Sequence, residues 1–128
     1  MSIDIEIDNE KSLIHLRLIG QMSVDDFKNA AKKMEENPDF RLDQNILFDL
    51  RQGDMSSMHT DDIRQILAVT QHHLRNRPVT MKTACVASRD VDYGIMRVYE
   101  AYRNNIPTQF YVFRKIDQAL KWLNSDNE

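Results

Sequence analysis

The chain has little of several residue types that mark particular classes of protein. Only one of its 128 residues is a cysteine, so no disulfide can form within it, and its three glycines are not arranged as a phosphate-binding loop. No apolar run approaches the roughly 20 residues needed to cross a bilayer. The first residues lack the basic and hydrophobic regions of a signal peptide, so we expect a cytoplasmic protein without an integral membrane segment.

Charge and composition point to an ordinary globular protein. The formal net charge is −3, which argues against a nucleic-acid partner held by phosphate contacts. Hydrophobic residues make up 41% and charged residues 29%, as in folded soluble proteins. The length suits one domain, so we expect a single domain over residues 1–128. Cys85 lies in an apolar run and is expected to be a small buried core residue.

The stretch around which the chain is organised is residues 45–50. Ile46, Leu47 and Phe48 are consecutive apolar residues, so both faces of this strand are expected to be buried, as in the centre of a parallel sheet. The polar loop 51–59 follows directly. Ligands and partners of open α/β sheets bind beyond the carboxyl ends of the strands, so this loop is a candidate contact surface.

The spacing of apolar residues predicts the element order β-β-α-β-α-β-α-β-α. The first two strands indicate an antiparallel hairpin, and the later strands alternate with helices, which indicates parallel strands joined by right-handed crossovers. A core-facing stripe is predicted in the third helix, made of Ile95, Val98, Tyr99 and Tyr102. The predicted strands are residues 3–8, 12–19, 45–50, 81–88 and 108–114, and the predicted helix caps are Ser23, Thr60 and either Asp90 or Asp92, with a last helix from about Ile116.

The second face of the predicted sheet needs a cover. Right-handed crossovers between strands in sequence order place their helices on one face. The strands at 45–50 and 108–113 are nevertheless apolar on both faces. This second face could be covered by the final helix, the hairpin, a lipid-like ligand or a second subunit. We therefore expect a homodimer or an apolar ligand.

Five segments, in order along nearly the whole chain, carry a family resemblance: residues 20–23, 46–51, 84–88, 93–100, and 112–114 with 119–123. Together they resemble the SpoIIAA-like group, of the STAS (anti-sigma factor antagonist) and CRAL-TRIO type of fold. The resemblance implies an α/β fold with a mostly parallel five-stranded sheet, an N-terminal antiparallel hairpin, and parallel strands that follow the sequence order. It implies no catalytic residue and no cofactor.

The resemblance also draws attention to two serines. Antagonists of this type are switched by phosphorylation of a serine at the start of the helix after the central strand, within an Asp-Ser-Ser-Gly-like motif. The corresponding residues here are 54–58, where the spacing is broken and the glycine is missing. Ser56 and Ser57 are therefore candidate phosphorylation sites, with ordinary loop serines as the alternative. A phosphate would bring roughly −2 charge to a region that already holds Asp54.

A second candidate surface combines arginines with an aromatic residue. Arg51, Arg89 and Arg97 are expected near the carboxyl edge of the sheet, and Arg89 comes just before a helix N-terminus, where anions bind. Tyr93 and Arg97 lie off the predicted apolar stripe of the third helix, as in a partner-binding patch. The alternative is that Arg97 pairs with Asp49 or Asp92 while Tyr93 covers the edge of the core.

A metal site and a methionine surface are weaker interpretations. His59, Asp61 and Asp62 are metal-ligating residue types, but neighbouring helical residues point in different directions, so we expect no metal. The methionines of the loop 51–59 and of the third helix are either core filling or an adaptable binding surface.

These patterns favour a non-enzymatic regulatory or protein-interaction domain of the anti-sigma-antagonist type. Its partner surface would be the loop 51–59 with the Tyr93–Arg97 edge. The alternative is a small carrier or sensor of a lipid-like or apolar ligand held between helices and sheet, as the CRAL-TRIO resemblance implies. An enzyme is disfavoured, because no nucleophile and base can be placed together.

Overall fold

The computed structural model describes residues 2–103 and 106–125, and in this part of the chain six strands form one sheet. Its main path runs β1-β2-β3-β5-β6, with β1 antiparallel to β2 and the other neighbours parallel. The predicted hairpin and the sequence order of the parallel strands are both confirmed. The strands are β1 (Ser2–Asp8), β2 (Leu13–Gln21), β3 (Asn45–Asp49), β4 (Gly53–Asp54), β5 (Lys82–Val86) and β6 (Gln109–Phe113).

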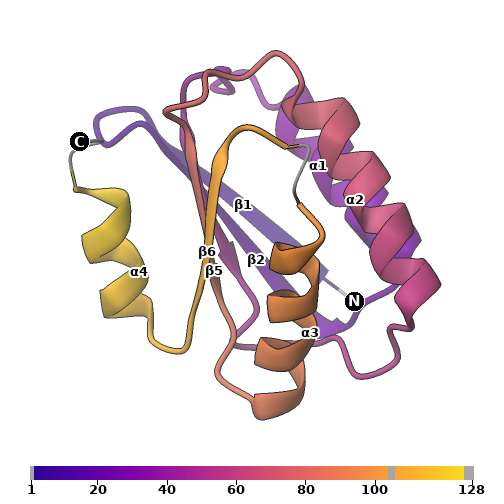
Figure 1. Ribbon diagram of the computed structural model, residues 1–128. Coiled ribbons are helices and arrows are strands. Elements are labelled where there is room, and N and C mark those ends of the chain that lie inside the picture. Colours follow the sequence, from indigo (N-terminus) through magenta and orange to yellow (C-terminus); the bar gives the residue numbers. More distant parts are fainter. Residues whose placement is uncertain (1, 104–105, 126–128) are drawn as a thin grey trace.

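Helices cover both faces of this sheet. The helices α1, α2 and α3 lie together on one face, and α4 lies alone on the other (Figure 1). Their order along the chain is the predicted one, and no described helix is long and apolar enough to cross a membrane. The helices are α1 (Val24–Glu36), α2 (Thr60–Leu74), α3 (Asp90–Ala101) and α4 (Ile116–Leu123).

The main core lies between the sheet and α1–α3. Alternation along β2 buries Ile14, Leu16 and Leu18 against the helices, and β3 is buried from residue 46 onward, as predicted. Cys85 is fully buried, and burial raises the pKa of its thiol well above the ordinary value. The core-filling interpretation of the methionines is confirmed, because all six that the structure describes are buried: Met22, Met34, Met55, Met58, Met81 and Met96.

A smaller core lies on the second face and is closed by α4. Ala119 and Leu123 pack there against Leu47, Ala84 and Val86. Of the four covers left open by the sequence, the final helix is the one observed. This face therefore gives no reason by itself to expect a second subunit or a ligand.

The strand β6 ends the main path of the sheet, where the predicted sequence order of the strands puts it, and it pairs with β5. Its residues are apolar on both faces and the second face was expected to be covered, but Tyr111 is 50% exposed. The short helix α4 covers Tyr111 only in part, through the side chain of Trp122. The Tyr111 ring is tilted against the rings of Phe113 and Trp122, with centroids 5.0 and 6.2 Å away.

The buried stripe of α3 also differs from the prediction. Val98 and Tyr102 are each more than 40% exposed, whereas Asp92, Met96 and Tyr99 are buried. The helix is therefore rotated relative to the expected stripe. Asp92 was predicted only as a possible cap of this helix, but it is buried, with partners that are described below.

The caps of the helices are partly as predicted. Ser23 caps α1 in a capping box: its Oγ accepts from the Asp26 N–H at 3.2 Å, and Asp26 Oδ2 accepts from the Ser23 N–H at 2.8 Å. The cap of α2 is His59 rather than Thr60, and that of α3 is Arg89 rather than Asp90 or Asp92. In both cases the helix begins one residue or more before the predicted position.

The strand β4 was not predicted. It extends the carboxyl end of the sheet by pairing in parallel with the end of β2, Gly20 with Gly53 and Gln21 with Asp54. The pairing depends on close backbone approach, because a Cβ on Gly53 would lie 3.0 Å from the Leu18 carbonyl oxygen. The strand fixes the position of the loop that follows β3.

Candidate functional site

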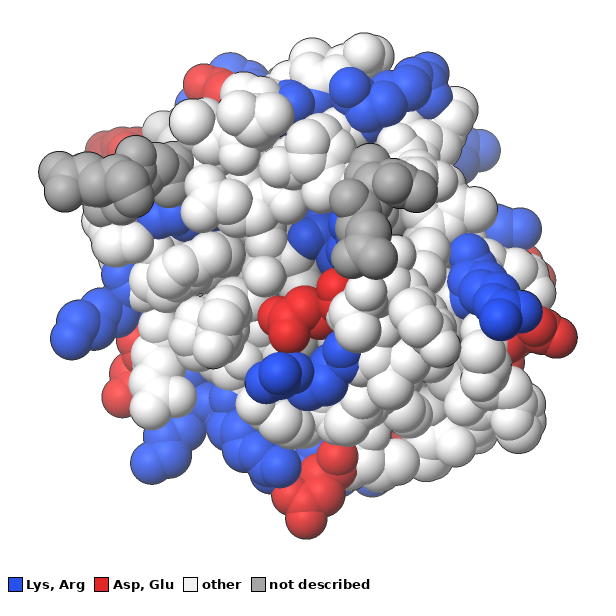
Figure 2. Space-filling model, viewed as in Figure 1, with Lys and Arg blue, Asp and Glu red and all other residues white. Residues whose placement is uncertain are grey.

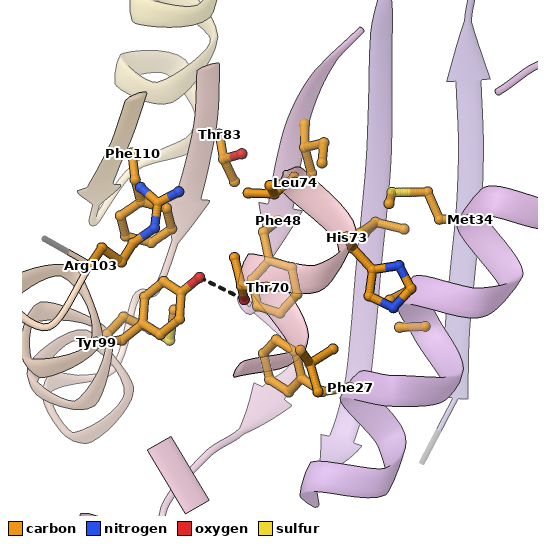
Figure 3. Close-up of a pocket in the computed structure, with 16 residues that line it drawn as sticks. Phe27, Met34, Phe48, Thr70, His73, Leu74, Thr83, Tyr99, Arg103 and Phe110 are labelled. Atoms are coloured by element: carbon orange, nitrogen blue, oxygen red, sulfur yellow. Dashed lines mark hydrogen bonds between the residues drawn. The ribbon is translucent and has the colours of Figure 1, made fainter. Parts of the chain in front are cut away.

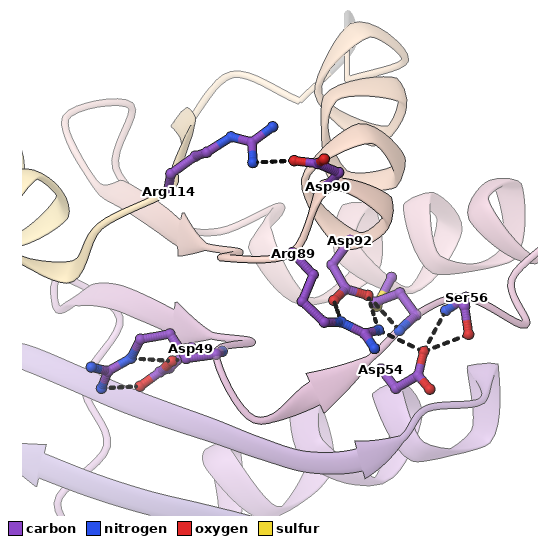
Figure 4. A network of polar contacts seen from close by, with 9 residues as sticks. Asp49, Asp54, Ser56, Arg89, Asp90, Asp92 and Arg114 are labelled. Atoms are coloured by element: carbon purple, nitrogen blue, oxygen red, sulfur yellow. Dashed lines mark hydrogen bonds and ion pairs between the residues drawn. The ribbon is translucent and has the colours of Figure 1, made fainter.

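The carboxyl edge of the sheet carries a polar cluster, which we call the rim network and define as Asp54, Ser56, Arg89 and Asp92 (Figure 4). Arg89 Nε donates to Asp92 Oδ2 at 2.7 Å, and its Nη2 donates to Asp92 Oδ1 at 3.1 Å and to Asp54 Oδ1 at 2.8 Å. One guanidinium thus joins the start of α3 to the end of β4. The two carboxylates, Asp92 first, raise the pKa of Arg89.

Asp92 is the buried centre of the rim network. Its side chain is inaccessible to solvent, and its Oδ1 accepts from the Met55 N–H at 2.7 Å. A buried carboxylate is tolerated only when it is paired and hydrogen-bonded, and Asp92 has both kinds of partner. It therefore fixes the loop after β4 against α3.

Ser56 is held by Asp54 in the same network. Asp54 Oδ1 accepts from the Ser56 Oγ–H at 2.6 Å and from the Ser56 N–H at 2.8 Å. These hydrogen bonds, followed by the one from Arg89, lower the pKa of Asp54 to about 2. A phosphate on Ser56 would meet this carboxylate at close range, so the arrangement opposes modification at Ser56 more than at the exposed Ser57.

Arg51 lies apart from the rim network, in a second pairing. Its Nε and Nη2 contact Asp49 Oδ1 and Oδ2 at 3.0 and 2.8 Å, while His15 Nε2 lies 3.0 Å from Asp49 Oδ2. Burial alone would raise the pKa of Asp49, but the hydrogen bonds of His15 and Arg51 outweigh it and hold that pKa well below its ordinary value. Asp49 in turn raises the pKa of Arg51.

Tyr93 and Arg97 lie together on the outer side of α3. Arg97 Nη1 donates to the Tyr93 hydroxyl at 3.3 Å, and Arg97 Nε lies 3.1 Å from Glu100 Oε1. The alternative pairing of Arg97 with Asp49 or Asp92 is therefore wrong, because Glu100 on the next turn takes that place. The guanidinium of Arg114 covers the Tyr93 ring at 4.3 Å from its centroid.

The six sequence-predicted site residues thus lie in three separate groups. Arg51 pairs with Asp49, Ser56 and Arg89 belong to the rim network, and Tyr93 with Arg97 forms the α3 pair, while Ser57 is exposed beside the network. Each of the three arginines has a carboxylate partner. Their binding roles remain predictions, and the pairing leaves little charge free to attract a ligand.

The residues considered for a metal serve helix capping and a surface ion pair. The His59 N–H donates to Asp62 Oδ2 at 2.9 Å, and Asp61 lies 3.5 Å from Arg64. Across residues 2–103 and 106–125, no three His, Cys, Asp or Glu side chains are grouped to hold a metal ion.

A pocket between the helices and the sheet, partly open to solvent, was not anticipated in detail by the sequence (Figure 3). Its volume is about 90 Å³, and it lies between α1, α2, α3 and the inner face of the sheet. Nearly all of its wall is apolar: α1 contributes Phe27, Ala30 and Met34, β3 contributes Phe48, and α3 contributes Met96. We call it the interior cavity.

Arg103 is the charged residue in this wall, and sequence reasoning missed it. It follows α3, four residues after Tyr99, and so continues the buried stripe of that helix by helical spacing. It is only 7% exposed, and its guanidinium carbon lies 4.7 Å from the Phe110 ring centroid (Figure 3). Burial lowers the pKa of Arg103.

Tyr99, Thr70 and His73 also present polar groups in the same wall. The Tyr99 hydroxyl donates to Thr70 Oγ1 at 2.9 Å, and Thr70 Oγ1 donates in turn to the Ile66 carbonyl oxygen at 2.9 Å. His73 also lines the cavity, but its Nδ1 lies 2.6 Å from Glu35 Oε1. These side chains are already engaged with protein partners.

The outer side of α3 carries exposed apolar side chains. Val91, Val98 and Tyr102 are 43%, 41% and 48% exposed, and their spacing of seven and four residues puts them on one side of the helix. Figure 2, viewed from the side of α3 and α4, shows charged residues of both signs scattered among broad uncharged areas. This side of the molecule is therefore not an electrostatic docking surface of one sign.

Comparison with known proteins identifies the fold. No family model matches the chain, and no curated protein matches it. A matching solved structure is that of an uncharacterized protein from the DUF3478 family with a SpoIIAA-like fold, from Shewanella loihica PV-4. The two are 17% identical, and the match covers 95% of this chain and 92% of that one with a TM-score of 0.62. The strand order, the hairpin and this likeness together establish that the chain has the SpoIIAA-like fold.

Proposed function

We propose that this protein is a non-enzymatic carrier or sensor that binds a small apolar molecule in the interior cavity. The observation that supports it is the cavity itself, an apolar space of about 90 Å³ between three helices and the sheet. Protein interiors are otherwise packed as densely as organic crystals. Water gains little in an apolar space, because it needs two to four polar partners there, so an apolar molecule is the better occupant.

The size of the cavity limits the ligand. An engineered apolar cavity of about 150 Å³ accepts benzene. The space here is smaller but partly open to solvent, so a slender chain of roughly six carbons can lie along it with one end protruding, whereas a ring or a long lipid fits less well. Burying about six methylene-sized groups at ~0.8 kcal/mol each corresponds to a Kd of a few tenths of a millimolar, roughly.

The groups around the cavity support binding rather than catalysis. Cys85 is fully buried and its raised pKa keeps the thiol protonated and unreactive. His73 and Tyr99 are held by Glu35 and Thr70, and neither is paired with a nucleophile. A catalytic constellation needs a nucleophile and a base within hydrogen-bond reach of each other.

The proposal is tested by filling the cavity. Ala30 is buried in α1 and lines the cavity, and Ala30→Leu adds three carbons to that space. The matched control is Ala68→Leu on the exposed side of α2. Calorimetric titration with 1-hexanol should show binding to the wild type and to Ala68→Leu, and at least a tenfold loss in Ala30→Leu. Equal binding by all three would place the alcohol elsewhere and refute the proposal.

A second candidate is a protein partner on the outer side of α3. The exposed Val91, Val98 and Tyr102 support it, because adjacent apolar side chains on a helix surface are typical of docking sites. The test is recovery of a partner on immobilised protein, identified by mass spectrometry, with Val98→Glu against Lys121→Glu on α4 as control. A partner lost only with Val98→Glu supports this surface, and recovery unchanged by Val98→Glu removes it.

A further inference from the structure

Arg103 has a buried hydrogen-bond donor without an acceptor. Its Nη2 donates to Thr108 Oγ1 at 3.1 Å and its Nη1 approaches the Thr108 carbonyl oxygen at 3.5 Å, but Nε is buried with no hydrogen-bond partner. Within residues 2–103 and 106–125, no carboxylate forms an ion pair with it. A buried guanidinium without a carboxylate is uncommon, because the cost of removing its charge from water is not offset.

The aromatic neighbours of Arg103 offset only part of this cost. Its guanidinium lies over the rings of Phe110 and Tyr99, with centroids 4.7 and 5.8 Å from the guanidinium carbon. Cation–π contacts of this kind stabilise a positive charge but accept no hydrogen bond. The Nε–H donor is left over, and Arg103 is part of the cavity wall.

Arg77 separates this arrangement from an ordinary buried arginine. It is equally buried, and its Nε and Nη2 also lack partners, but it does not line the interior cavity. Its Nη1 donates to the carbonyl oxygens of Leu42 and Gln44 at 3.2 and 3.0 Å, so it ties the connection before β3 in place. At Arg103, by contrast, a buried Nε donor without an acceptor lies in the wall of the interior cavity.

We propose that Arg103 binds the carboxylate of a small aliphatic monocarboxylate whose chain occupies the interior cavity. This inference rests on the proposed function and adds the chemical class of the ligand. The carboxylate would accept from the Arg103 Nε–H, and its negative charge would neutralise the guanidinium. Because folding has already removed the cation from water, binding adds no further desolvation of Arg103, and the remaining costs are desolvation of the carboxylate and the lost freedom of the ligand.

The donor geometry selects a carboxylate over a phosphate. In the cavity wall, Nε of Arg103 is a nitrogen without an acceptor, while the nearby Tyr99 and Thr70 hydroxyls are bonded to each other and to the protein. A phosphate has more oxygens and more charge to satisfy than this end of the cavity can serve. A carboxylate with a narrow chain of about six carbons meets both limits.

The test compares hexanoate with 1-hexanol, which has the same chain length and no charge. We expect hexanoate to bind the wild type about tenfold more tightly than the alcohol, because a charge-assisted hydrogen bond is added. In Arg103→Met, hexanoate binding should fall at least tenfold while 1-hexanol binding stays within about twofold. A structural role for Arg103 would instead weaken both ligands together.

A second readout locates the carboxylate directly. The Arg103 Nε–H resonance in the ¹H–¹⁵N NMR spectrum should shift on titration with hexanoate and stay in place with 1-hexanol. If Arg103→Met does not fold, this shift and the wild-type affinity ratio decide the question. Binding of 1-hexanol without tighter binding of hexanoate would overturn the inference and leave the proposed function intact, whereas binding of neither would refute both.

Discussion

The two ends of α3 hold arginines in opposite circumstances. At the N-terminal end, Arg89 is half exposed and meets two carboxylates, Asp54 and Asp92. Beyond the C-terminal end, Arg103 is buried, faces aromatic rings and has an unpaired Nε. The exposed Arg89 thus has carboxylate partners within the protein, whereas the buried Arg103 keeps a hydrogen-bond donor without an acceptor.

This contrast changes the interpretation of the candidate sites. The rim network lies where partners of α/β sheets usually bind, but its charges neutralise one another and fix the loop after β4. We therefore interpret it as a structural connection. Arg103, in contrast, contacts Thr108 and two aromatic rings, and its Nε–H donor has no acceptor.

The largest loss of stability is expected when the paired carboxylate at the N-terminal end of α3 is removed. Asp92→Ala would leave the Met55 N–H without its acceptor and remove the buried partner of Arg89, so the free energy of unfolding should fall by about 3 kcal/mol. Urea denaturation measures it. Asp92→Asn keeps an acceptor oxygen and should be less destabilised. Equal stability of Asp92→Ala and the wild type would contradict the structural interpretation of the rim network.

A smaller, pH-dependent effect is expected at Asp49, where a carboxylate is paired with Arg51 and His15. Because its pKa in the folded protein lies below the ordinary value, the carboxylate contributes stability above about pH 4 that is lost as the pH falls toward the folded pKa. Asp49→Asn should lower the free energy of unfolding by about 2 kcal/mol at neutral pH and by less in acid. Chemical denaturation at pH 7 and pH 3 measures it.

The control for this comparison is Asp4→Asn on the exposed side of β1. It should leave both the stability and its pH dependence close to those of the wild type. If Asp49→Asn showed the same acid sensitivity as the wild type, Asp49 would not be a source of it.

Removing the charge of Arg103, beyond the C-terminal end of α3, should change the stability of the protein only weakly. Arg103→Met replaces an incompletely paired buried cation by an apolar side chain of similar length, an exchange that is often neutral or stabilising. We expect the free energy of unfolding to change by less than about 1 kcal/mol. Urea denaturation beside Asp92→Ala measures the difference between the two ends of α3. A loss as large as that of Asp92→Ala would erase the distinction between them.

The smallest effect concerns the hydrogen bonds within the rim network. Ser56→Ala removes the side-chain hydrogen bond that contributes most to the low pKa of Asp54, so that pKa should rise from about 2 toward its ordinary value. Titration of the Asp54 carboxyl carbon by ¹³C NMR measures it. Ser57→Ala is the neighbouring control and should leave the titration unchanged, and a similar shift in both variants would contradict the assigned contacts.

Much of the fold could be predicted from the sequence, because the signals are local. Consecutive apolar residues at 46–48 predicted the central strand, and alternation predicted the hairpin. The strand β4 was missed because two residues, Gly53 and Asp54, carry no periodic pattern. Pairing with the end of β2 creates that strand, and the partner is more than thirty residues away.

The candidate site was harder to predict, because it depends on tertiary partners. The sequence pattern predicted Asp92 only as a possible helix cap and did not single out Arg103, yet Asp92 is buried with the Met55 N–H and Arg103 is buried beside Phe110. The interior cavity is a property of how three helices sit on the sheet, and no short stretch of sequence encodes its volume. The buried Arg103 could be suspected only from its helical spacing of four residues after Tyr99.

The most direct test of ligand binding in the interior cavity uses methionine methyl groups as reporters. Met34 and Met96 line the cavity, whereas Met55 and Met58 are buried residues of the loop after β4 and are not among its lining residues. In ¹³C-methyl NMR spectra recorded during titration with 1-hexanol, we predict saturable shifts of the Met34 and Met96 resonances and unchanged Met55 and Met58 resonances. Shifts confined to Met55 and Met58, or no shift at Met34 and Met96, would contradict the account.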